Sequence, residues 1–103
     1  MERIIVTVEP DLEGLIDGFL VSRQLDSEKL QTAIVEHDFE EMRNIGNSLK
    51  KAGSGCGFDF ISIIGTKIEM AGTQKNKLGA EIALDALNWY LGRIRTEVFG
   101  EGL

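Results

Sequence analysis

A group of polar residues with helical spacing lies between residues 43 and 54 of the chain, and three of its members are cations that flank an asparagine. On an α-helix all five fall within about 100° of arc, opposite an apolar side. Cations in this arrangement favour an anionic partner, because local charge complementarity steers encounter even when the net charge repels. We call this set the basic stripe: Arg43, Asn47, Lys50, Lys51 and Ser54.

The surroundings of the basic stripe leave its role open. An ordinary solvated helix face is one alternative, and Glu40 and Glu41 directly before the stripe fit it. Phe60 and Ile63 lie off the apolar face expected for the following helix, so we expect both to be exposed beside the stripe. Exposed apolar residues rimmed by charge are typical of protein-docking surfaces. The alternative is that a small bundle buries a wide apolar face containing both residues.

Residue types that support metal, redox or nucleophilic chemistry are scarce in this chain. The single cysteine, Cys56, excludes an intramolecular disulfide, and with the single histidine, His37, it leaves a zinc site short of its usual ligands. We interpret Cys56 as a small buried apolar residue and His37 as a polar turn residue. The sequence therefore predicts no metal, no cofactor and no catalytic residue. A net charge of −6 argues against nucleic-acid binding, which requires a dominant basic surface.

The N-terminal half of the chain has one or two helices. Pro10, followed by acidic residues, suits a helix start, and apolar residues then recur with helical spacing as far as Leu20. A second helical segment, DSEKLQTAIVEH, continues this helix or follows a kink near residues 23–26. The sequence does not decide between these two arrangements, because the segment contains no proline.

The helix that carries the basic stripe has clear start and stop signals. Asp38 and Glu41 have the spacing of a capping box, so this helix is predicted to begin at about Phe39. It should end within the glycines at 53–57, where the left-handed exit conformation is accessible. Its apolar residues Met42, Ile45 and Leu49 face the core. Further helices are predicted from about Asp59, with Ile61, Ile64, Ile68 and Ala71 inward, and over Leu78–Val98 after a turn at 72–77.

Together these elements predict an all-α helical bundle of four or five helices in antiparallel order. The length of 103 residues indicates a single domain, 1–103, with an extended arm over 1–9 and a helical body over about 10–98. The arm contains RIIVTV, for which we find no partner strand, so it lies against the body or offers an edge to another molecule. No apolar run approaches the roughly 20 residues of a membrane span, and we expect a cytoplasmic protein without membrane contact.

The segments LEGLIDGFL, AIVEHDFEEMRNIGNSLKKAGSGCGF and SIIGTKIEMAG follow one another as in a known family. From about Asp11 to Leu91 the chain resembles a histidine-containing phosphotransfer (HPt) domain of bacterial phosphorelays. The resemblance implies an antiparallel four-helix bundle with an additional N-terminal helix. It also implies docking to a response-regulator receiver domain or a histidine kinase. In the family a Leu-Lys-Gly run and small residues follow the phosphoacceptor histidine, and a Gly-Phe pair opens the next helix. Here these places are held by Leu49, Lys50, Gly53, Gly57 and Phe58.

Two residues depart from the family pattern at its centre. Asn47 stands in the place of the phosphoacceptor histidine, and Lys51 stands where the family keeps a glycine that leaves space for the partner. An imidazole nitrogen presents a lone pair to phosphorus, whereas the lone pair of an amide nitrogen is delocalised. Lys50 matches a lysine that stabilises the phosphoryl group in the family. His37 lies about 15 Å of helix before Asn47 and would displace the reaction from the basic stripe.

Three functions follow as hypotheses. The leading one is a non-enzymatic, phosphotransfer-incompetent HPt-like adaptor that binds a receiver domain or a kinase through the basic stripe, Phe60 and Ile63. The second is an active phosphorelay intermediate, in which Asn47 is an introduced substitution or His37 accepts the phosphoryl group. The third is a structural helical bundle that self-associates through Phe60, Ile63 and the RIIVTV arm, although a monomer is the first expectation.

Overall fold

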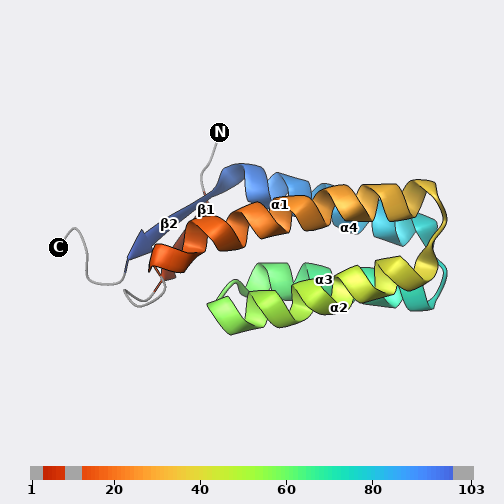
Figure 1. The fold of residues 1–103 in the computed structure, drawn as a ribbon, viewed down its shortest axis with the longest axis horizontal. Coiled ribbons are helices and arrows are strands. Elements are labelled where there is room, and N and C mark those ends of the chain that lie inside the picture. The colour runs from red at the N-terminus through yellow and green to blue at the C-terminus, as the bar shows by residue number, and fades with distance from the viewer. Residues whose placement is uncertain (1–3, 9–12, 99–103) are drawn as a thin grey trace.

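The computed structural model of the protein describes residues 4–8 and 13–98, which form four helices and two short strands. Successive helices run antiparallel and are joined by short turns, with α1 beside α4 and α2 beside α3 (Figure 1). The predicted helical bundle of four helices is confirmed. In chain order the elements are β1 (Ile4–Val8), α1 (Glu13–Val35), α2 (Phe39–Cys56), α3 (Asp59–Thr73), α4 (Lys77–Arg93) and β2 (Ile94–Val98).

The two N-terminal helical segments form one continuous helix, α1. The additional N-terminal helix is therefore not present in the described part of the chain, and the predicted start at Pro10 lies outside it. Arg23 and Asp26, where a kink was considered, form an ion pair of 2.8 Å within the helix. The Arg23 guanidinium also lies 4.8 Å from the centre of the Phe19 ring. Both charged side chains are thus largely shielded from water without interrupting α1.

The predicted limits of α2 are confirmed. The Asp38 carboxylate accepts a hydrogen bond of 3.1 Å from the backbone N–H of Glu41, which satisfies one of the unpaired amides at the helix start. Gly57 follows the helix with φ of 79°, a left-handed conformation that costs glycine little. His37 in the turn before α2 and Lys75 in the turn before α4 have φ of 56° and 55°. This left-handed backbone conformation is strained for residues that have a side chain.

The last helix is shorter than predicted. It begins at Lys77, with the Asn76 side chain accepting from the backbone N–H of Gly79 at 3.0 Å, and it ends at Arg93. The predicted extension to Val98 is wrong, because residues 94–98 form strand β2. The segment IRTEV has β-branched residues at every second position, a period that suits a strand better than a helix.

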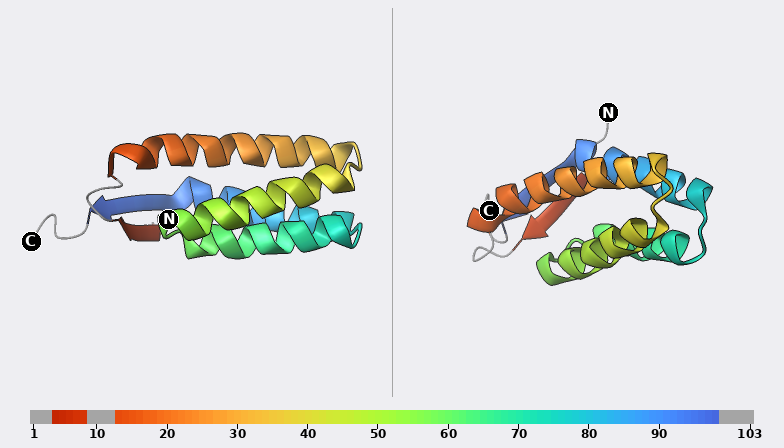
Figure 2. Two further views of the ribbon diagram at one scale, coloured as in Figure 1. Left: turned by 60° about the horizontal axis from the view of Figure 1, so that its bottom comes forward. Right: turned by 45° about the vertical axis from the view of Figure 1, so that its right-hand side comes forward.

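Strand β2 pairs in parallel with β1, with Ile4 opposite Ile94 and Val8 opposite Val98. The expectation that the N-terminal segment has no partner strand is therefore wrong. The partner strand β2 was not predicted from the sequence, because its residues were interpreted as the end of a helix. The two strands form a ribbon that extends α4 beyond the ends of α2 and α3 (Figure 2).

The core lies between the two helix pairs. Most of the helix faces that were predicted to point inward do so. Met42, Ile45 and Leu49 of α2 are buried, and Phe58 at the α2–α3 turn stacks on Phe19 with 4.9 Å between ring centres. Leu15 and Ile82 also belong to the apolar helical patterns of their segments, but they are exposed at 66% and 62%. The other large buried side chains include Leu30, Ile61, Ile64, Ile68, Leu87, Tyr90, Leu91 and Ile94.

Candidate functional site

The helix that carries the basic stripe packs against α3 with the two backbones in contact. A Cβ added to Gly46 would lie 2.3 Å from the backbone nitrogen of Glu69, and one added to Gly65 would lie 2.4 Å from that of Lys50. Real Cβ atoms do not approach other atoms this closely, so only glycine fits at these positions. Gly53 and Gly72, each seven residues further along its helix, repeat the contact with 2.6 and 2.5 Å. This spacing of two helical turns keeps the α2–α3 pair close along its length.

The close approach places Glu69 of α3 between two residues of the basic stripe. The Asn47 amide donates through Nδ2 to Oε2 of Glu69 at 2.7 Å, and the Lys50 ammonium donates to Oε1 at 3.0 Å. Each carboxylate oxygen of Glu69 therefore has its own donor from α2. We call Asn47, Lys50 and Glu69 the Glu69 cluster.

The electrostatics of the Glu69 cluster favour the ionised carboxylate. The hydrogen bond from Asn47 and then that from Lys50 lower the pKa of Glu69 below its ordinary value of 4.5, against a smaller opposing effect of partial burial. The charges of Lys50 and of Arg43 act in the same direction. The centre of the basic stripe thus already holds an anion, supplied by the chain itself.

The orientation predicted for Asn47 is wrong. Its place opposite the apolar side of the helix predicts a side chain that points to solvent, but this side chain is half-buried and donates across the helix pair. Glu69 was not among the candidate residues. The signal that could have found it is the pair of glycines at 46 and 53 on one helix and at 65 and 72 on the next, because matched glycines bring two helices close enough for short polar contacts.

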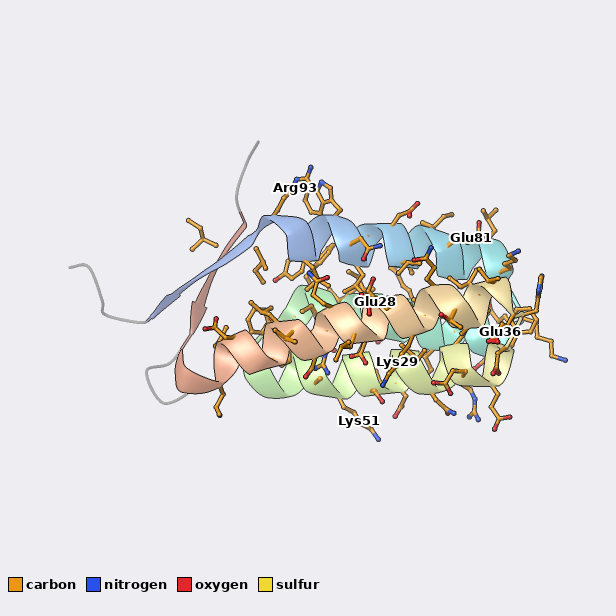
Figure 3. The ribbon with its side chains drawn as sticks, turned by 45° about the horizontal axis from the view of Figure 1, so that its top comes forward. Glu28, Lys29, Glu36, Lys51, Glu81 and Arg93 are labelled. Carbon is orange, nitrogen blue, oxygen red and sulfur yellow. The ribbon has the colours of Figure 1, made fainter. Side chains whose placement is uncertain are left out.

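The remaining members of the basic stripe, Arg43, Lys51 and Ser54, are exposed as predicted. The Lys51 side chain extends away from the bundle (Figure 3). Neither Arg43 nor Lys51 forms an ion pair within residues 4–8 and 13–98. Arg43 and Glu69 also line a shallow cavity of about 220 Å³ with Met70, Thr73 and Gln74.

Phe60 and Ile63 are exposed at 39% and 53%, as expected, but they do not lie beside the Glu69 cluster. The Phe60 ring packs on Tyr90 of α4 with 4.7 Å between ring centres. Glu69 is nine residues further along α3, which is about half a turn around the helix. Phe60 therefore lies on another side of α3 from the Glu69 cluster. The exposed apolar side chains of α3 and α4 include Phe60, Ile63, Met70, Ile82 and Trp89, and Met70 also lines the cavity with Arg43 and Glu69.

His37, the single histidine, lies apart from the Glu69 cluster. His37 is exposed in the α1–α2 turn, with its ring edge toward Phe39 at 6.3 Å between centres. The side chain of Cys56 lies outside the described part of the structure. No cluster of three metal-ligating side chains occurs in the part of the chain that the structure describes. No helix described there has the length and apolar character needed to cross a membrane.

Comparisons with protein-family models, with curated proteins and with solved structures give no match to this chain. The chemistry of the site therefore has to be judged from its own groups. The site consists of a neutral amide and an ammonium–carboxylate pair. It therefore contains no activated nucleophile and no free acid–base pair. What the surface offers is a fixed polar centre with two exposed cations, Arg43 and Lys51, at its margin.

Proposed function

We propose that this protein is a binding module of the HPt type that does not itself carry a phosphoryl group. Its partner would be a response-regulator receiver domain or a histidine kinase, docked on the basic stripe. The adaptor would have no enzymatic activity, and its role would be to occupy or position the partner.

One observation above all supports this proposal: Asn47, which holds the place of the phosphoacceptor histidine in the HPt resemblance, donates an amide hydrogen to Glu69. An amide in this bond has no lone pair to offer phosphorus. Lys50, in the place of the phosphoryl-stabilising lysine, is likewise occupied by Glu69. The Glu69 carboxylate would compete with a phosphoryl group for both donors, which favours docking over transfer.

The exposed cations supply the means of docking. Arg43 and Lys51 are exposed at the margin of the Glu69 cluster, and a receiver domain presents an acidic pocket. Rim charges of this kind steer encounter and select partners, and their effect weakens as salt rises. The Glu69 cluster would fix the positions of α2 and α3 beneath the partner.

The experiment measures binding of candidate receiver domains, with and without a phosphoryl mimic, by titration calorimetry. We expect the double variant Arg43→Gln, Lys51→Gln to bind about tenfold more weakly than wild type, since each surface charge pair contributes up to roughly 1 kcal/mol. The matched control is Lys29→Gln, Lys67→Gln, which removes two exposed cations from α1 and from the far side of α3. Equal affinity of the two double variants would refute the basic stripe as the docking surface.

Phosphotransfer is tested separately. Incubation with a phosphodonor kinase, followed by mass measurement before and after acid treatment, should leave the wild-type mass unchanged. An acid-labile gain of one phosphoryl group would instead support the active phosphorelay intermediate and exclude the incompetent adaptor. The same measurement on the variant Asn47→His then tests whether an imidazole at this position accepts a phosphoryl group.

A further inference from the structure

A second cavity, of about 250 Å³, lies between α3 and α4 beside the turn that joins them. Its apolar lining comes from the side chains of Met70, Ala71 and Ile82, and Gly79 at the start of α4 adds no side chain to fill the space. Met70 and Ile82 are 51% and 62% exposed, so an apolar group bound here would remove from water surface that the fold leaves uncovered. The cavity can therefore hold the apolar part of a small ligand.

The polar side chains that line this cavity are all hydrogen-bond donors. They are Lys67, Gln74 and Asn76, and the described lining includes no carboxylate. Lys67 is exposed and has no carboxylate within ion-pair distance in the described part of the chain. The positions one turn away from it on α3, in either direction, are isoleucine, methionine or alanine. The positive charge at the cavity is therefore not compensated by its surroundings.

The side chain of Asn76 is held with its amide nitrogen left over for a ligand. The backbone N–H of Asn76 donates to the carbonyl of Ala71 at 2.8 Å, and its Oδ1 accepts from the backbone N–H of Gly79 at 3.0 Å. Because a backbone N–H only donates, the amide oxygen must face it, which leaves Nδ2 as a further donor. A Cβ added to Gly79 would lie 2.8 Å from this Nδ2, so the donor lies over the glycine that lines the cavity.

The chain around the cavity is basic, although the protein as a whole is acidic. Residues 70–80 contain Lys75 and Lys77 and no acidic residue, and Lys77 approaches its partner Glu81 only to 4.0 Å. Glu69 of α3 is turned toward α2, where Asn47 and Lys50 hold it. Local charge of one sign attracts a ligand of the opposite sign even when the net charge repels it. The charge of the surroundings thus favours an anion.

We infer that this cavity binds a small amphipathic carboxylate. Its apolar part would lie against Met70 and Ile82, and its carboxylate would pair with Lys67, with the amides of Gln74 and Asn76 as further donors. The volume is below the roughly 300 Å³ at which pockets for drug-sized ligands begin, so the ligand is a short-chain or single-ring acid. This inference is independent of the proposed function, because the lining includes no residue of the basic stripe and not Glu69.

A titration of the isotope-labelled wild type, followed by the NMR shifts of its backbone amides, tests the inference. The probes are octanoate, the neutral octanamide and the cationic octylammonium, which share one apolar chain. We expect octanoate to give saturable shifts within residues 67–82, with a dissociation constant in the millimolar range that suits a ligand of this size. Octanamide should bind about fivefold more weakly, because it forms no ion pair, and octylammonium should not saturate. Equal binding of octanoate and octanamide, or octanoate shifts that do not saturate or lie elsewhere, would overturn the inference.

Variants of exposed residues separate the two parts of the site. Lys67→Gln should weaken octanoate about fivefold and leave octanamide unchanged, whereas Lys29→Gln, which removes an exposed cation from α1, should change neither. Ile82→Ser should weaken both ligands. Its matched control is Leu78→Ser, since Leu78 is 65% exposed on the same helix and does not line the cavity. Helical circular dichroism verifies that each variant is folded. Equal effects of a variant and its control would assign the binding to non-specific contacts and refute the site.

Discussion

The two helix pairs of the bundle are held together in opposite ways. In the α2–α3 pair, glycines let one backbone lie directly on the other, and a Cβ at Gly46 or Gly65 would meet backbone atoms within 2.7 Å. In the α1–α4 pair the contact is made by side chains, among them the buried Ser27 hydroxyl, which donates to Oδ1 of Asn88 at 2.5 Å. The basic stripe lies on the pair with the backbone contact.

Glycines also occur in the α1–α4 pair, and three of them leave space unused. Gly14 and Gly18 of α1 and Gly92 of α4 have nothing within 4 Å of an added Cβ. The number of glycines therefore does not distinguish the two helix pairs. The pairs differ in whether another backbone lies opposite the glycine. This contrast explains why Asn47 and Lys50 reach Glu69 at hydrogen-bond distance, since short polar contacts between helices require closely spaced axes.

The largest expected effect comes from adding one carbon atom between α2 and α3. Gly46→Ala should lower the free energy of unfolding by about 3 kcal/mol or more, because the backbones must separate to admit the methyl group. Gly18→Ala on α1 is the matched control and should raise stability by about 0.5–1 kcal/mol, because alanine favours the helix and the space is open. Urea denaturation measures both. Equal effects would remove the distinction between the two pairs.

A smaller effect is expected at the turns. Gly57, between α2 and α3, has φ of 79°, so Gly57→Ala should cost about 1–2 kcal/mol. Lys75, between α3 and α4, holds a similar conformation with a side chain present, so Lys75→Gly should gain about 0.5–1 kcal/mol. Thermal or urea unfolding of both variants checks the opposite signs. A loss of stability in Lys75→Gly would indicate that its side chain, not its backbone, matters at this turn.

The polar contact between α1 and α4 should be worth about 1 kcal/mol. Ser27→Ala removes the buried hydroxyl that donates to Asn88, and the net value of one such hydrogen bond is modest because water replaces it in the unfolded chain. A double-mutant cycle with Asn88→Ala isolates the pair. A coupling energy near zero would show that apolar packing alone joins α1 to α4.

The smallest effect concerns the Glu69 cluster and takes the form of a pH dependence. Because hydrogen bonds from Asn47 and Lys50 lower the pKa of Glu69 in the folded state, their stabilisation is complete above the ordinary value of 4.5 and is lost as pH falls through the folded-state pKa. Wild type should therefore exceed Glu69→Gln in unfolding free energy at neutral pH, and the difference should shrink below about pH 4.5. Glu81→Gln is the control, since Glu81 and its partner Lys77 are exposed and 4.0 Å apart. A difference independent of pH would exclude the ionised carboxylate as its cause.

The sequence predicted those parts of the fold that depend on local signals. The start of α2 follows from Asp38, whose side chain caps the helix, and the inward face of α3 follows from the spacing of Ile61, Ile64 and Ile68. Such features require only the residues within a few turns of one helix. The end of α4 was missed because IRTEV is too short to outweigh the helical pattern before it, and its strand partner lies at the other end of the chain.

The sequence predicted which cations of the candidate site are exposed, but it predicted neither Glu69 nor the geometry of the site. Arg43 and Lys51 are exposed as expected, whereas the direction of Asn47 depends on Glu69, which comes from another helix. The direction of Phe60 depends on Tyr90 of α4 in the same way. A helical wheel gives the angle of a side chain around its own axis. It does not give the residue that lies opposite.

The pairing of β1 with β2 joins the two ends of the chain and so constrains the order of folding. Ile4 meets Ile94, and the loop that this contact closes contains all four helices, so its entropic cost exceeds that of the turns between successive helices. The helical turns close short loops and can form early. The ribbon should therefore form last, after the bundle has brought its ends together, and during synthesis it can form only once the C-terminal strand has left the ribosome.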